Sequence, residues 1–192
     1  MTLITIYILC HNRPIDAERC IRSVLGQTDQ NFTLIVSDNS SNDEVETKVR
    51  EKFPDIQFLR RKPMLPALEH FNKCIDEVSS GHFCLFHDDD LMMPDFIKQT
   101  RLAIEYFPNA IAIGSNAYIE TNGQPHSKAS FASTVGHEVI DSARELAKRY
   151  FGRYQSGIAP FPGYMYRRDV IAALRFNPEE GKYSDVTWLL RL

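Results

Sequence analysis

The sequence lacks the features that mark membrane, secreted and zinc-binding proteins. No segment approaches the roughly 18 apolar residues of a membrane span, and residues 3–9 read as a strand that is too short and too poorly flanked for a signal peptide. The four cysteines show no CxxC pair and no zinc-like spacing. We therefore expect reduced core thiols in a cytoplasmic protein, and contact with the inner face of a membrane stays open.

Excess positive charge is also missing. The net charge is −3, and the only basic run is Arg60-Arg61-Lys62. Binding to a nucleic-acid backbone needs clustered lysine and arginine, so we expect no nucleic-acid partner. Walker A and GxGxxG patterns are absent too, which leaves a P-loop nucleotidase or a Rossmann dehydrogenase without support.

The composition is that of one ordinary globular domain. The chain has 192 residues, of which 43% are hydrophobic and 24% charged. Apolar runs alternate with amphipathic stretches, which predicts an α/β fold with a mostly parallel sheet and crossover helices. Strands are expected at 3–9, 32–36, 56–60, 82–86 and 110–114, and helices at 14–25, 43–52, 66–79, 94–106, 141–150, 167–174 and 183–192. Asn122-Gly123 signals a turn, in a hairpin or a long loop.

Three consecutive aspartates, Asp88, Asp89 and Asp90, follow the apolar run 83–86. Ligands bind at the carboxyl ends of strands in open α/β sheets, and hard divalent cations prefer oxygen ligands. The triplet therefore indicates a metal or phosphate site, and a solvated acidic turn is the alternative. Capping of the next helix is less favoured, because Pro94 fits the first helical position and makes the preceding Met93 the expected cap.

Two further polar loops, 10–13 and 37–43, also follow predicted strands. A parallel sheet would gather both of them on one edge with the aspartate triplet. The segment from His11 to Arg13 could contact a base or a phosphate, or simply start a helix. Asp38 could accept a hydrogen bond from a base or ribose, or form an Asx-turn.

Four blocks, at residues 10–14, 23–28, 32–43 and 86–95, resemble the successive signatures of family 2 glycosyltransferases. The resemblance implies a GT-A fold, which is a Rossmann-like α/β/α sandwich. It also implies inverting transfer of a sugar from a nucleoside-diphosphate donor to an acceptor hydroxyl. Residues 1–115 would then form the nucleotide-sugar half of a single domain, and residues 116–192 the acceptor half.

The same resemblance assigns roles to individual residues. Asp38 would bind the base, and the aspartate triplet would match the DxD motif that binds ribose and Mn²⁺ or Mg²⁺. The donor-binding residues implied are His11, Asn12, Arg13, Asp38, Asn39, Arg61, Asp88 and Asp89, and the metal ligands are Asp88, Asp89 and Asp90.

The sequence departs from the family pattern in two places. His87 stands where many members have the first aspartate, which leaves open which two of the three aspartates bind the metal. Phe71-Asn72 replaces the usual Arg-Asn pair, so a diphosphate contact would move to Arg60, Arg61 or His70.

Asp185 resembles the catalytic base of the family, although Ser184 stands where a glutamate is common. Without the resemblance, Asp185 would be read as an ordinary acid in the first turn of a helix. Residues 161–168 fall where the family builds its acceptor wall, and buried core aromatics are the alternative reading.

We therefore expect a metal-dependent inverting glycosyltransferase, with a glycan or lipid-linked acceptor and a role in cell-surface polysaccharide synthesis. Uridine is the expected base by family habit, while self-association stays open. A metal-dependent nucleotidyl- or phosphoryl-transfer enzyme and a non-catalytic sugar-nucleotide-binding module are the competing hypotheses. The apolar terminal segment 186–192 has no stop signal, which suggests the catalytic core of a longer enzyme.

Overall fold

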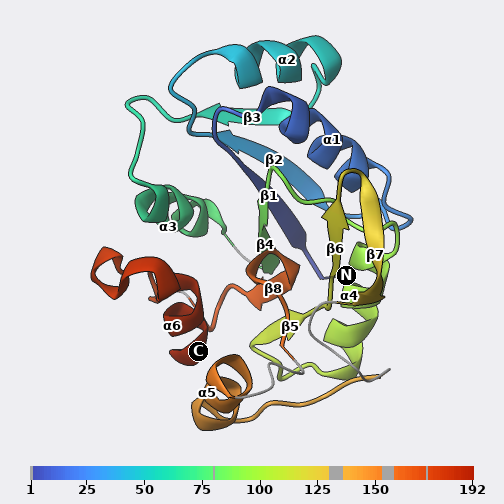
Figure 1. The fold of residues 1–192 in the computed structure, drawn as a ribbon, viewed down its shortest axis with the longest axis vertical. Helices are drawn as coiled ribbons and strands as arrows, with labels where there is room; N and C mark the ends of the chain where they lie inside the picture. The colour runs from blue at the N-terminus through green and yellow to red at the C-terminus, as the bar shows by residue number, and fades with distance from the viewer. Residues whose placement is uncertain (1, 80, 130–135, 153–157, 172) are drawn as a thin grey trace.

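The computed structural model describes residues 2–79, 81–129, 136–152, 158–171 and 173–192. Helices cover both faces of a central sheet (Figure 1). The strands are β1 (Ile4–Cys10), β2 (Thr33–Asp38), β3 (Gln57–Arg60), β4 (His82–His87), β5 (Ala112–Gly114), β6 (Tyr118–Thr121), β7 (Gln124–Ala129) and β8 (Tyr164–Arg167). The helices are α1 (Pro14–Leu25), α2 (Glu44–Lys52), α3 (Ala67–Glu77), α4 (Phe96–Tyr106), α5 (Ala143–Phe151) and α6 (Ser184–Leu190), with 3₁₀ turns η1 (Phe161–Gly163) and η2 (Pro178–Tyr183).

The central sheet has six strands in the order β3-β2-β1-β4-β8-β5. The first four are parallel, as β1 pairs with both β2 and β4, and β2 pairs with β3. β8 runs antiparallel to β4, and β5 runs antiparallel to β8. The sheet is thus mostly parallel, which confirms the predicted fold class.

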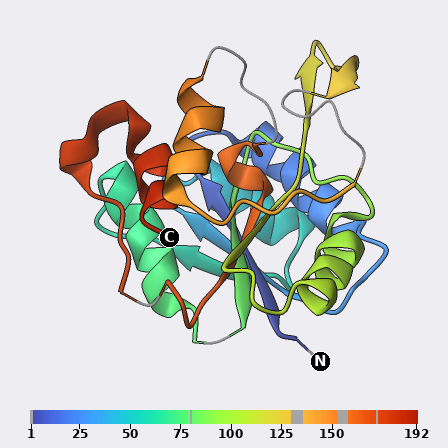
Figure 2. The same ribbon diagram turned by 90° about the horizontal axis from the view of Figure 1, so that it is seen from below.

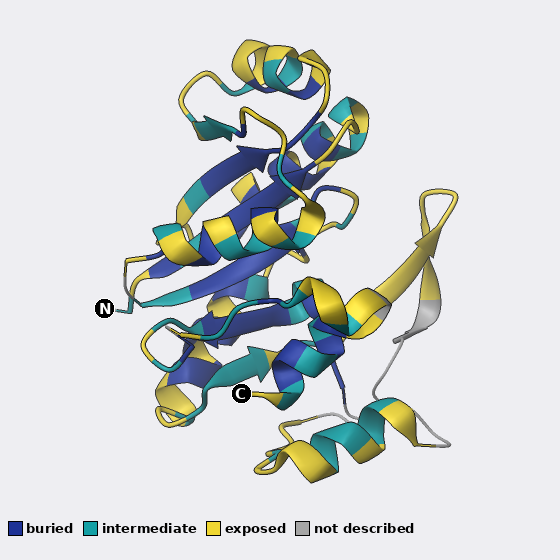
Figure 3. Cartoon of the chain, turned by 90° about the vertical axis from the view of Figure 1, so that its left-hand side faces the viewer, coloured by how far each residue is buried: buried dark blue, intermediate teal, exposed yellow. Residues whose placement is uncertain are grey.

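Alternating side chains of β1 divide the core into two layers. Ile6 and Ile8 pack with the buried faces of α1, α2 and α4, whereas Tyr7 and Leu9 pack with α3 and α6. This two-residue period is the one expected of a strand that is covered on both faces. Figure 3 shows the buried strands between two layers of half-buried helices. The predicted α/β/α sandwich is confirmed.

The first predicted helix shows why the amino-terminal half follows the sequence pattern closely. Pro14 occupies the start of α1, where a missing N–H costs nothing. Its buried residues are Ala17, Cys20, Ile21 and Val24, one stripe of a helix with 3.6 residues per turn. Cys10, Cys20, Cys74 and Cys84 are all free and buried, as predicted.

The helix predicted at 167–174 was wrong. Arg167 instead ends β8, and its backbone N–H donates to the carbonyl of Ile111 at 2.9 Å, while that of Arg168 donates to Gly81 at 2.9 Å. Three of the residues of β8 are buried between β4 and β5. Aromatic residues suit such a position, but the surrounding prolines and glycines are typical of loops, so this strand of only four residues was not predicted.

Helix α4 begins later than predicted, and the hairpin is where the turn signal put it. The first helical residue is Phe96 and the cap is Asp95, so Met93 and Pro94 precede the helix. The aspartate triplet therefore lies even further from the cap than expected. β6 and β7 pair around Asn122-Gly123 (Figure 2), where both residues have the positive φ of a hairpin turn.

The carboxyl-terminal helix packs onto this domain. Val186, Trp188 and Leu189 are buried, and Trp188 has no exposed surface. Among the described helices, none has the length and apolar character needed to cross a membrane.

Candidate functional site

The loops of the predicted site meet at the carboxyl edge of the sheet. In the parallel register Cys10 lies beside Asp38, and Leu9 lies beside His87. Strands β1, β2 and β4 therefore end at the same level, and the loops that follow them are neighbours (Figure 1). The predicted convergence of the three polar loops is confirmed.

Asp88 is fully buried and ties two of these loops together. Its Oδ2 accepts a hydrogen bond from the backbone N–H of His11 at 2.9 Å, and its Oδ1 lies 2.5 Å from Nη2 of Arg13. Burial raises the pKa of Asp88, against the opposing effects of the His11 N–H and the Arg13 charge. Arg13 also forms an ion pair with Asp89. Asp88 thus faces the loop after β1.

The loops after β1 and β2 are joined by their own hydrogen bonds. His11 Nδ1 lies 2.8 Å from the carbonyl oxygen of Asn39. The backbone N–H of Asn12 donates to Ser40 Oγ at 2.8 Å, and that of Ser41 donates to Asn12 Oδ1 at 2.9 Å. Asn12 has a φ of 54°, a left-handed conformation that asparagine tolerates. The side chains of His11 and Asn12 are exposed beside the acidic loop, where a ligand can reach them.

Asp38 and Asn39 are buried in the loop after β2. Asp38 Oδ1 accepts from the backbone N–H of Ser40 at 3.0 Å, and its Oδ2 forms an ion pair with Arg60. The Asn39 side chain bonds the backbone of Leu65 twice, at 2.8 Å each. The Asx-turn reading of Asp38 is thus confirmed. Its contact with a nucleobase stays a prediction, and so does donor binding by Asn39.

Arg61 lies in a buried polar network. Its Nη1 and Nη2 each donate to a carboxylate oxygen of Glu77 at 2.7 Å, and its Nε donates to Ser37 Oγ at 2.9 Å. Ser37 Oγ also lies 2.7 Å from Nε2 of His70. Donor binding by Arg61 stays a prediction, and it would require this guanidinium to leave Glu77.

His70 makes the stability of this network depend on pH. Burial, followed by the charge of Arg61, lowers the pKa of His70 from 6.5 to about 4. Between these values the unfolded chain binds more protons, so the free energy of unfolding should fall by about 3 kcal/mol as the pH falls. Urea unfolding across this range will measure the loss. The decrease in the free energy of unfolding should be smaller in His70→Gln and should be retained in His126→Gln, which alters an exposed histidine. An unchanged decrease in His70→Gln would contradict the role given to His70.

His87, Asp89 and Asp90 form a cluster that could hold a metal ion, with one ligand atom from each lying within 4.8 Å of the others. The backbone N–H of Asp90 donates to the carbonyl of His87 at 3.3 Å, which closes a tight turn after β4. This turn brings His87 and Asp90 together, with Nδ1 and Oδ2 3.9 Å apart. The sequence pointed to His87 only through its place in the family pattern.

The protonation of this cluster is set mainly by burial. Burial lowers the pKa of His87, which favours the neutral imidazole that a metal requires. Burial and then the charge of Asp89 raise the pKa of Asp90 to about 6. Nε2 of His87 is buried and has no hydrogen-bond partner among the described residues. Two carboxylates and an imidazole are a donor set that suits a divalent cation such as Mn²⁺.

Asp185 lies in the first turn of α6 and is half-buried. Its negative charge acts on the His87 imidazole, partly opposing the effect of burial on the pKa of that ring. Aromatic rings connect the two elements. His87 and Phe161 have ring centroids 5.6 Å apart, and the contacts continue through Phe176 to Trp188 of α6. These contacts join helix α6, which carries Asp185, to the end of β4.

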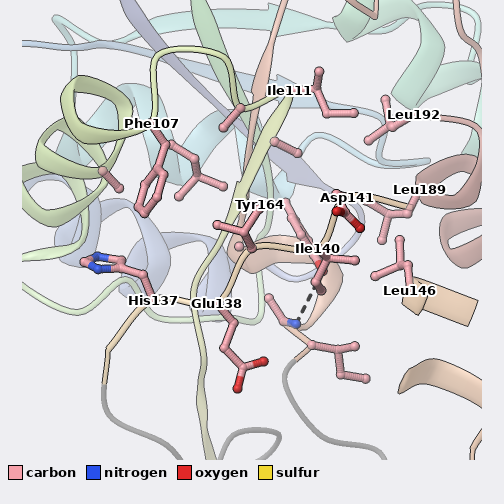
Figure 4. A pocket seen from close by; sticks show the side chains of 18 of the residues that line it. Phe107, Ile111, His137, Glu138, Ile140, Asp141, Leu146, Tyr164, Leu189 and Leu192 are labelled. Carbon is pink, nitrogen blue, oxygen red and sulfur yellow. Dashed lines mark hydrogen bonds between the residues drawn. The ribbon is translucent and has the colours of Figure 1, made fainter. Parts of the chain in front are cut away.

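The predicted acceptor wall is largely core. Phe161, Tyr164, Met165 and Tyr166 are buried, which favours the reading of these residues as core aromatics. A cavity of about 970 Å³ lies beyond Tyr164, between α4, β5, α5 and the last turn of α6. Figure 4 shows apolar side chains in its lining, including Phe107, Ile140 and Leu189, together with the polar side chains of His137, Glu138 and Asp141. Its described lining residues include Tyr164 of the predicted acceptor wall, but neither Asp185 nor any residue predicted to bind the donor or the metal.

The family model described as "Glycosyl transferase family 2" matches residues 5–175, which include all four signature blocks. The chain belongs to glycosyltransferase family 2. Among curated proteins, uncharacterized protein MT1568 of Mycobacterium tuberculosis is 32% identical over 100 residues, which are 50% of this chain and 30% of that protein. An uncharacterized glycosyltransferase of Haemophilus influenzae is 29% identical over 108 residues, 56% of this chain and 36% of that protein.

Solved structures of similar fold include TarS of S. aureus (residues 1–349), with a TM-score of 0.70 and 15% identity over 98% of this chain and 54% of that one. The structure of the same TarS fragment with UDP-GlcNAc has a TM-score of 0.70 and 14% identity, over 99% of this chain and 54% of that one. Mannosyltransferase PcManGT of Pyrobaculum calidifontis, with GDP-Man and Mn²⁺, has a TM-score of 0.62 and 15% identity, over 96% of this chain and 50% of that one.

These likenesses confirm the family 2 assignment and the GT-A fold. The chain spans about a third of the length of the curated relatives and about half of the structural neighbours.

Proposed function

We propose that this family 2 domain catalyses the inverting transfer of a sugar from a nucleoside-diphosphate sugar to an acceptor hydroxyl, with the help of a divalent metal ion. The observation that carries the proposal is the single sheet edge where His11 and Asn12 meet the cluster of His87, Asp89 and Asp90. The negative charge of Asp185, which acts on the His87 imidazole, supports a place for Asp185 near this edge. UDP, UDP-GlcNAc and GDP-Man with Mn²⁺ bound to structural neighbours support the same class of donor.

The metal ligands that we propose are His87, Asp89 and Asp90. One ligand atom from each residue lies within 4.8 Å of the others, and Nδ1 of His87 lies 3.9 Å from Oδ2 of Asp90, which supports this set. Asp88, also predicted as a ligand, is engaged by His11 and Arg13 and would support the site from beneath. A cation held there would neutralise the diphosphate leaving group.

The chain's own residues supply the remaining steps. The exposed side chains of His11 and Asn12 would contact the nucleotide, at a loop whose shape is set by the bonds to Asn39, Ser40 and Ser41. The Asp185 carboxylate would remove the proton of the acceptor hydroxyl as its oxygen attacks the anomeric carbon. The bond from that carbon to the diphosphate breaks on the opposite side, so the configuration inverts.

The wider setting follows from the same proposal. We infer UDP-sugar as the first donor to test, and a glycan or lipid-linked acceptor of cell-surface polysaccharide synthesis. This setting would place the enzyme in the cytoplasm, at the inner face of the membrane for a lipid-linked acceptor. A further segment that completes the acceptor side is consistent with the greater length of the relatives.

The nucleotide product shows which bond of the donor breaks, and it therefore distinguishes sugar transfer from nucleotidyl or phosphoryl transfer. The chain should be incubated with UDP-GlcNAc or GDP-Man, Mn²⁺ and candidate acceptors, and the nucleotide products separated by chromatography. Release of nucleoside diphosphate supports sugar transfer, whereas nucleoside monophosphate with sugar phosphate supports the competitor. Donor binding without either product would indicate a binding module.

A thermal-shift screen of UDP, GDP and TDP, each with and without Mn²⁺, should identify the base. A ligand that binds only the folded state raises the apparent stability by mass action, by about 2.7 kcal/mol at a hundredfold excess over its Kd. The nucleotide with the largest Mn²⁺-dependent shift is the one whose sugars should then be assayed.

A further inference from the structure

Arg13 bridges two aspartates that differ in their surroundings. The Asp88 side chain is 0% exposed and is also held by the backbone of His11. The Asp89 side chain is 46% exposed and belongs to the proposed metal cluster. Arg13 itself is 42% exposed, so its guanidinium has room to move. One end of this bridge is anchored and the other is exchangeable.

The Arg13 guanidinium and a metal ion would compete for the Asp89 carboxylate, because both are positively charged. Arginine is not deprotonated in proteins, so the Arg13 guanidinium brings a positive charge to the Asp88 and Asp89 carboxylates. A divalent cation that binds Asp89 must therefore share this carboxylate with a positive group or displace it. A diphosphate changes the balance, because its oxygens can accept charge-assisted hydrogen bonds from a released guanidinium.

We propose that Arg13 makes metal binding depend on donor binding, by serving as the counter-ion of Asp89 until a metal and a diphosphate arrive together. This inference rests on the proposed function, since it assumes that both ligands use this edge. Arg13 is thus a positioning residue that acts through Asp89. In the released state its guanidinium stays tethered to Asp88 and faces the diphosphate.

The measurable consequence is a coupling between two ligands. Coupling is reciprocal, and each ligand should tighten the binding of the other by the same factor. If Arg13 only fastened the loop after β1 to the loop after β4, its removal would lower stability and leave this factor unchanged. The ratio of Mn²⁺ affinities with and without nucleotide separates the two roles.

The test uses electron paramagnetic resonance to count free Mn²⁺ in titrations of the whole chain, alone and with saturating UDP or GDP. In Arg13→Gln we expect the affinity for Mn²⁺ alone to rise about tenfold and the coupling factor to fall about tenfold, a typical range for linked sites. Arg22→Gln is the matched control. It removes the same charge from an arginine of α1 that pairs with Glu18 instead, and it should keep the parent values.

Thermal unfolding will show that each variant is folded. If Arg13→Gln does not fold, Arg13→Lys decides, because an ammonium cannot bridge two carboxylates as a guanidinium does; it should shift both quantities in the same direction by less. Parent-like values in the folded variant, or equal Mn²⁺ affinity of the parent with and without nucleotide, would overturn the coupling role while leaving the transfer function standing. A parent chain that binds no Mn²⁺ under either condition would overturn the proposed metal site itself.

Discussion

Replacing Asp185 with asparagine should lower the rate of sugar transfer by about 10²-fold or more, with donor affinity retained. The carboxylate is proposed to take the proton of the acceptor hydroxyl, and the amide cannot. Asp185 lies in the first turn of α6, half-buried and held by the aromatic contacts that end at Trp188. Asparagine has nearly the same shape, so the helix should remain in place.

Transfer rates and the Kd of the nucleoside diphosphate should both be measured, because a base acts on the acceptor and not on the donor. Glu179→Gln is a suitable control, since it removes an exposed carboxylate from the 3₁₀ turn that precedes α6. Parental rates in Asp185→Asn would assign the base elsewhere, and a large loss in Glu179→Gln would make that residue the next candidate.

Replacing Asp89 and Asp90 together with alanine should abolish the metal-dependent part of donor binding. Two of the three proposed ligands disappear, and His87 alone would hold the cation poorly. The ratio of nucleoside-diphosphate affinities with and without Mn²⁺ should then fall to about 1, the value for uncoupled ligands. Isothermal titration calorimetry measures this ratio directly.

The double variant removes two negative charges, so it needs a control of equal charge. Glu51→Ala with Asp55→Ala serves this purpose, because both residues are exposed and lie outside the proposed site. Asp88→Asn provides a second comparison. It should lower the midpoint of thermal unfolding, since it weakens the buried link between His11 and Arg13. An unchanged metal dependence in the Asp89 and Asp90 double variant would remove the cluster from the mechanism.

Much of the site was predictable because it depends on strand ends. The aspartate triplet, the segment from His11 to Arg13, and Asp38 all follow apolar runs, and parallel strands bring their carboxyl ends to one edge. Which of the aspartates face the same way was not predictable. The turn between His87 and Asp90 directs Asp88 into the protein and brings His87 towards Asp90, and such directions depend on backbone angles that a residue pattern does not contain.

The ion-pair partners of Arg60 and Arg61 could not be predicted from the sequence either. Arg60 and Arg61 are adjacent in the chain, yet Arg60 pairs with Asp38 and Arg61 pairs with Glu77. Successive residues at the end of a strand point to opposite faces, so each meets a different part of the fold. A basic run that reads as one feature is therefore divided between the site and the core.

The sequence by itself determined the α/β class, the parallel half of the sheet and the family, because apolar periodicity and motif spacing are local properties of the chain. Only the tertiary structure decided the strand β8, the later start of α4, and the grouping of His87 with Asp89 and Asp90. The grouping of His87 with Asp90 depends on the backbone turn after β4. Strand β8 depends instead on contacts between segments distant in sequence, since it forms where β4 and β5 can pair with it, and α6 is likewise joined to β4 by aromatic rings from other segments. Such contacts add free energy that local propensity does not record, and they prevail where the local preference is weak.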